Sequence, residues 1–157
     1  MPKSVLPKFI ILAAIFAATI ISFAFTRHMD EQEMLAWGNK CLNESFDPTV
    51  DVKLKKWQLE LTPEAFLRVR KTYQSKKEEY FSFQLHRMVD MNYLGTQESG
   101  MLQFKTAEDD IIVQVTNDKK GDLDTLATTL SIPMKNMPLE RLDSLRTVLE
   151  YFKNKEF

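Results

Sequence analysis

The strongest hydrophobic pattern lies at the start of the chain. Residues 9–26 carry no charged side chain, and their only polar members are Thr19, Ser22 and Thr26. As a helix this segment is about 27 Å long, close to the ~30 Å hydrocarbon core of a bilayer. Because backbone polar groups must be paired within lipid, the pattern predicts a single transmembrane helix.

The charges that flank this segment predict its orientation. Lys3 and Lys8 precede it, and acidic residues dominate the stretch that follows it. The positive-inside rule therefore predicts a short cytoplasmic tail over 1–8 and an extracytoplasmic, specifically periplasmic, domain over 28–157. The alternative is a signal peptide cleaved after Ala24, which gives a secreted or periplasmic product.

Two segments of the remaining chain have the periodicity of amphipathic helices. Within 29–42, Met34, Trp37 and Cys41 recur at the spacing of one helical face. Near the end of the chain, Pro138 opens a second stripe, which is formed by Leu139, Leu142, Leu145 or Arg146, Leu149 and Phe152. We therefore expect one helix at each end of the domain, the second being C-terminal.

Residues 50–61 alternate between apolar and polar side chains, but the phase changes within the segment. The apolar positions of 50–54 are even-numbered and those of 57–61 are odd-numbered, with Lys55 and Lys56 at the change. Such a shift is typical of a strand that contains a bulge.

The next segment, 62–73, begins with the signature of a helix start. Thr62, Pro63 and Glu64 fit an N-cap, the first helical position and an acidic first turn. The apolar residues that follow share a helical face, so a helix over 66–73 is predicted. A strand over 66–73 is the alternative.

Period-2 alternation predicts several further strands. Residues 79–94 alternate throughout, and because this run exceeds the usual strand length, we expect a bend or break near Arg87. Residues 101–107 and 110–116 predict two more strands. Residues 123–132 fit a short helix or a strand, and their Thr-rich, β-branched composition favours the strand.

Together these elements predict an α+β fold after the N-terminal transmembrane or signal segment. A meander of consecutive strands pairs antiparallel. We therefore expect a two-layer domain with a mainly antiparallel sheet of about five strands, covered by helices that include the C-terminal one.

Composition limits the chemistry of the domain. Residues 28–157 hold 18 Lys+Arg against 22 Asp+Glu, a net charge of −4, because Lys3, Lys8 and Arg27 precede this range. This balance provides no basic footprint, so no nucleic-acid partner is expected. One Cys, two His and four Gly exclude disulfide frameworks, multi-Cys zinc sites and glycine-rich nucleotide loops, and no cofactor is expected.

Three residues are candidates for a functional role. Arg87 occupies the apolar phase of its strand, so it is turned outward by a bulge, forms a buried ion pair, or binds an anionic ligand. His86 lies beside it on the polar side. Cys41 lies on an apolar helical face, where it is a small core residue or a thiol that pairs with another chain. No catalytic, cofactor-binding or metal-binding residue is identified.

The sequence supports three hypotheses of function. The first is a membrane-anchored, non-catalytic interaction or scaffold protein that binds protein partners, forms oligomers or serves as a subunit of an envelope assembly. The second is an exported module that binds a small molecule or a lipid. The third is an enzyme of unrecognised type, although no catalytic set of residues supports it.

Overall fold

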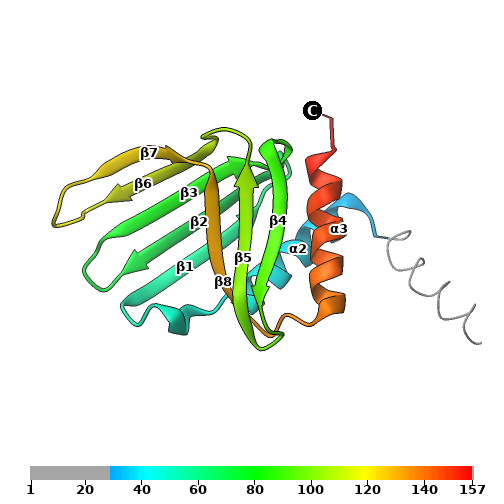
Figure 1. Cartoon of the computed structure of the whole chain (residues 1–157), viewed down its shortest axis with the longest axis horizontal. Coiled ribbons are helices and arrows are strands. Elements are labelled where there is room, and N and C mark those ends of the chain that lie inside the picture. The colour runs from blue at the N-terminus through cyan, green and yellow to red at the C-terminus, as the bar shows by residue number, and fades with distance from the viewer. Residues whose placement is uncertain (1–28, 157) are drawn as a thin grey trace, which may run out of the picture. The chain divides into compact units, whose positions relative to one another are not determined.

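A computed structural model describes residues 29–156 of the chain (Figure 1). In chain order, the elements are α2 (Glu31–Ser45), the 3-10 turn η1 (Pro48–Val50), β1 (Leu54–Leu61), β2 (Phe66–Tyr73), β3 (Glu78–Gln84), the 3-10 turn η2 (Leu85–Arg87), β4 (Met88–Gly95), β5 (Ser99–Thr106), β6 (Ile111–Thr116), β7 (Leu123–Ala127), β8 (Thr129–Lys135) and α3 (Leu139–Lys153). The fold is therefore α+β, as predicted, with a C-terminal helix.

The chain forms two compact units, and the first of them ends at Met34. The described residues of this first unit include the first turn of α2. There the Glu33 amide donates to Asp30 Oδ1 at 2.8 Å, and the Asp30 amide donates to Glu33 Oε2 at 3.2 Å. This reciprocal arrangement is a capping box. The predicted anchor at 9–26 lies outside the described residues. No helix within 29–156 has both the length and the apolar character needed to cross a membrane.

The second unit, 35–157, contains two antiparallel sheets. One has five strands in the order β1-β2-β3-β6-β7, and the other has three in the order β4-β5-β8. The prediction of about five antiparallel strands in a single sheet is therefore confirmed for one sheet, and the second sheet is a correction. Figure 1 shows the three strands of the smaller sheet crossing one face of the larger sheet, with α3 beside β4.

The hydrophobic core lies between the two sheets and the helices. Phe83 of β3 and Phe104 of β5 meet with their ring centroids 5.7 Å apart. The strands and helices of both layers contribute fully buried side chains, among them Leu42, Leu59, Leu67, Leu102, Ile111, Ile132 and Phe152. Burial of apolar side chains of this size stabilises a fold by about 1.5–3 kcal/mol each.

The predicted helix over 66–73 is wrong, and the alternative strand is correct. Thr62 and Ala65 instead form a tight turn, in which the Ala65 amide donates to the Thr62 carbonyl at 3.0 Å and Ala65 has φ 60°. The turn joins β1 to β2, and Leu61 pairs with Leu67 across it. The residues that resemble a helix start therefore close a hairpin, because cross-strand pairing overrides the local helical preference.

Other strand predictions are confirmed with changes in their bounds. The register of β1 shifts between Leu54 and Lys56, which confirms the predicted bulge. The strand begins at Leu54 and does not extend back to residue 50, which belongs to η1; Val50 and Val52 are 63% and 81% exposed. The strand predicted over 123–132 is two strands that belong to different sheets, with Thr128 between them.

The predicted break near Arg87 is confirmed, and it explains the second sheet. Residues 85–87 form η2, so the long alternating run divides into β3 and β4. β3 pairs within the larger sheet, whereas β4 pairs only with β5 in the smaller sheet. The break therefore transfers the chain from one layer to the other.

Candidate functional site

One edge of the five-stranded sheet is closed by side chains of α2. The Asn39 amide donates to the Leu61 carbonyl at 2.9 Å and accepts from the Leu61 amide at 2.7 Å. One turn later, Asn43 makes the same pair of bonds to Leu59, at 2.7 and 3.3 Å. The two carboxamides therefore act as a surrogate strand along β1, and they satisfy backbone groups that an edge strand otherwise leaves unpaired.

The opposite edge of this sheet, β7, has no such cover among the described residues. β7 pairs with β6 on one side and ends the strand order on the other (Figure 1). Leu123 and Leu126 are 51% and 55% exposed. Ile112 of β6 is the cross-strand neighbour of Leu126 and is also exposed. An open edge with apolar side chains is a template for pairing with another chain.

A polar pocket of about 770 Å³ lies at the ends of the β2–β3 and β6–β7 hairpins. The segment that leads into β1 supplies part of its wall. The pocket is lined by Asp51, Lys53, Tyr73, Gln74, Ser75, Lys77, Glu79, Asn117, Asp118, Lys119 and Lys120. Tyr73 is the only aromatic side chain in this lining, and no aliphatic residue is present.

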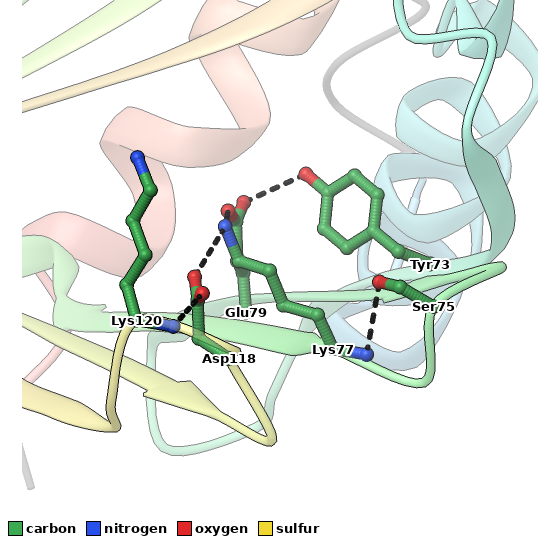
Figure 2. Close-up of polar contacts among 6 residues, drawn as sticks. All are labelled: Tyr73, Ser75, Lys77, Glu79, Asp118 and Lys120. Atoms are coloured by element: carbon green, nitrogen blue, oxygen red, sulfur yellow. Dashed lines mark hydrogen bonds and ion pairs between the residues drawn. The ribbon is translucent and has the colours of Figure 1, made fainter.

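The centre of the pocket is a hydrogen-bonded network, which Figure 2 shows. The Tyr73 hydroxyl donates to Glu79 Oε2 at 2.8 Å. The Lys77 ammonium group lies 2.9 Å from Glu79 Oε1 and 3.3 Å from Asp118 Oδ2. The Lys120 amide donates to the other oxygen of Asp118 at 2.9 Å. Lys77 therefore joins two hairpins that pair through β3 and β6.

The electrostatics of this network favour fixed charges over proton transfer. Burial and the carboxylates of Glu79 and Asp51 raise the pKa of Tyr73, so its hydroxyl stays protonated. The hydrogen bond to Glu79 raises the pKa of Lys77, so the amine stays charged. The Lys120 amide and then Lys77 lower the pKa of Asp118. A general base or an amine nucleophile needs a pKa near neutrality, and these shifts move Tyr73 and Lys77 away from it.

The structure places Arg87 and His86 on the surface, outside this pocket. Both residues lie in η2 and are exposed. The Arg87 guanidinium is 3.9 Å from Asp110 Oδ1, and its side chain is 55% exposed. This pair is therefore a surface ion pair, a class that contributes about 0–1 kcal/mol to stability.

Cys41 lies in the core of the second unit. It is a free cysteine, 2% exposed. Burial raises the pKa of its thiol, although the neighbouring Arg141 acts in the opposite direction. A protonated, enclosed thiol is a poor nucleophile, so the position fits a small core residue.

Sequence reasoning missed the residues that form the pocket and the closed edge. Neither Asp118 nor Lys77 stands out in the sequence, because their contact depends on the pairing of β3 with β6. The spacing of Asn39 and Asn43 does place them on one helical face, which was a usable signal. Residues 29–156 contain no group of three or more His, Cys, Asp or Glu arranged to hold a metal ion.

Comparison with known proteins identifies no relative of this chain. No family model, curated protein or solved structure shows a significant match to the chain. The open edge and the polar pocket are therefore interpreted from their own chemistry.

Proposed function

We propose that this chain is a membrane-anchored, extracytoplasmic, non-catalytic interaction protein that binds an extended segment of a partner protein along β7. The observation that carries the proposal is the asymmetry between the two edges of the five-stranded sheet. α2 closes the β1 edge with four side-chain hydrogen bonds, whereas β7 is uncovered within the described residues. Addition of a strand to an exposed sheet edge is a recurring mode of peptide recognition.

The side chains around β7 define the chemistry of the partner. Leu126 and Ile112 form an exposed apolar pair on one face of the sheet, and Asp124 lies on the same face two residues before Leu126. Asp124 and the neighbouring Asp122 have no cationic partner among the ion pairs of the described residues. A partner segment that alternates apolar and basic side chains is complementary to this edge.

A pair of charge-introducing variants tests this proposal. In the tagged full-length chain, Leu123→Lys and Leu126→Lys together should abolish chemical crosslinking to the partner in native membranes. Both residues are more than half exposed, so the free energy of unfolding of the double variant should lie within about 1 kcal/mol of the wild-type value.

The matched control is Val52→Lys, which changes an 81%-exposed apolar residue away from β7. It should retain the crosslinked partner. A partner adduct that survives the double variant would contradict the proposal. The same holds if the wild type yields only monomers, or only adducts between two copies of this chain.

The extracytoplasmic location of the domain is part of the same proposal, and a separate experiment tests it. With residues 9–26 as a retained anchor, a C-terminal tag should be digested by protease in right-side-out vesicles and protected in inside-out vesicles. The mass of the mature protein distinguishes a retained anchor from cleavage after Ala24. Protection in right-side-out vesicles would overturn the extracytoplasmic orientation.

A second function, the binding of a small polar ligand, is favoured by one observation. The pocket near Tyr73 has a volume of about 770 Å³, within the roughly 300–1,000 Å³ typical of ligand sites. Its polar lining favours a water-soluble ligand over a lipid.

A further inference from the structure

We infer that the polar pocket between the β2–β3 and β6–β7 hairpins binds an anionic saccharide, a sugar that carries a carboxylate or a phosphate. The inference rests on the pocket lining, and it is independent of the proposal for β7. It assigns a ligand class to a site that the sequence did not reveal.

The charges of the pocket favour an anion. Of its seven ionisable lysine and acidic side chains, four are lysines and three are acids. Lys77 pairs with both Glu79 and Asp118, and its single positive charge balances one of their two negative charges. No ion pair of the described residues involves Lys53, Lys119 or Lys120. Against Asp51 and the remaining negative charge of the Lys77 cluster, these three ammonium groups leave the lining with a net charge of +1, four lysines minus three acids, which attracts a negatively charged ligand.

The remaining lining favours a ligand with many hydroxyl groups. Ser75, Gln74 and Asn117 provide hydroxyl and carboxamide groups, which both donate and accept hydrogen bonds. Gln74 uses one donor on the Val52 carbonyl, at 3.5 Å, and its other groups remain available. A ligand with only anionic groups cannot donate a hydrogen bond to the acceptors of the lining. A sugar hydroxyl can donate to these acceptors and can also accept from the donors.

The pocket is held in one arrangement by the network at its centre. Asp118 accepts hydrogen bonds from the Lys120 amide and, through Lys77, is tied to Glu79. Figure 2 shows these side chains converging from the two hairpins. A pre-formed arrangement of this kind reduces the ordering cost of binding.

Titration of the full-length chain in detergent micelles tests the inference. Three probes are compared: digalacturonic acid for the carboxylate form, glucose 6-phosphate for the phosphate form, and lactose as the neutral control. We expect at least one anionic probe to bind at millimolar concentration or below, with amide NMR shifts confined to the pocket segments around Ser75 and Asn117. Lactose should not bind in this range.

Matched variants show whether the lysines are responsible. Lys119→Ala with Lys120→Ala should weaken binding of the anionic probe about tenfold, which corresponds to the loss of two exposed charge contacts. The backbone amide of residue 120 remains, so the turn at Asp118 is retained. Lys56→Ala with Lys105→Ala removes the same charge from exposed positions outside the pocket and should leave binding unchanged.

Three results would overturn the inference. The first is failure of both anionic probes to bind the wild type. The second is equal binding of lactose, and the third is equal weakening by the two double variants. Binding of digalacturonic acid alone identifies a sugar carboxylate as the ligand group, and binding of glucose 6-phosphate alone identifies a sugar phosphate.

Discussion

Replacement of Asn39 by alanine should lower the free energy of unfolding of this domain by more than is usual for a residue on the surface of a helix. The Asn39 carboxamide makes both of its hydrogen bonds to the backbone of one residue, the N–H and the carbonyl of Leu61. Leu61 is 1% exposed, so water does not readily replace the lost partner. The substitution therefore leaves a buried donor and a buried acceptor unpaired.

The size of the effect follows from these two groups. Each unpaired buried polar group costs about 1–3 kcal/mol. Alanine recovers roughly 0.5 kcal/mol through its higher helix propensity. We expect a net loss of about 1.5–5.5 kcal/mol, which lowers the melting temperature by on the order of 10 °C for a domain of this size. Asn39→Asp should be comparably harmful, because a carboxylate cannot donate to the Leu61 carbonyl.

The assay is thermal and urea unfolding of the full-length chain in detergent, followed by near-ultraviolet circular dichroism. Lys40→Ala is the control, since it changes an exposed neighbour on the same helix whose ion pair with Glu44 spans 3.8 Å. It should shift the unfolding free energy by less than about 0.5 kcal/mol. If Asn39→Ala and Lys40→Ala are indistinguishable, the surrogate-strand role of Asn39 is refuted.

Three further predictions follow from single residues. The buried thiol of Cys41, whose pKa is raised by burial, should resist a thiol-specific reagent until the chain unfolds, and rapid labelling of the native protein or a disulfide-linked dimer would contradict this. Arg87→Met should change the unfolding free energy by no more than about 0.5 kcal/mol, because its pair with Asp110 is exposed; a loss above about 2 kcal/mol would count against a surface role. Asp118→Asn should destabilise the fold at neutral pH. Because the folded pKa of Asp118 is lowered from its ordinary value of 3.8, the difference in unfolding free energy should begin to shrink as the pH approaches 3.8 and should vanish only below the lowered folded pKa; a difference that does not shrink in acid would contradict the network.

The helices and most strands were predictable because their apolar periodicity coincides with their buried faces. In the stripe of α3, Leu149 and Phe152 are fully buried, whereas Leu139 at its start is 60% exposed. The failure at 66–73 has a physical reason. Thr62 and Pro63 fit a turn as well as a helix start, and pairing of Leu61 with Leu67 decides between the two.

The division into two sheets was not predictable from local pattern. The alternation of 79–94 continues through its break, so the sequence predicts a bend near Arg87 but not a transfer to a second layer. The pocket was not predictable from the sequence for a related reason. Tyr73, Lys77 and Glu79 share one hairpin, but Asp118 joins them only because β3 pairs with β6, a contact between segments distant in the chain.

Site-specific photocrosslinking from the edge of the larger sheet shows whether a partner protein docks along β7. A photoreactive residue replaces Thr125, which is exposed on β7, or Gln58, which is exposed on the closed strand β1, in the full-length chain in native membranes. We expect a discrete protein adduct from position 125 that disappears when Leu123→Lys and Leu126→Lys are added, and no such adduct from position 58. Equal adducts from both positions, or none from position 125, would contradict β7 as the docking edge.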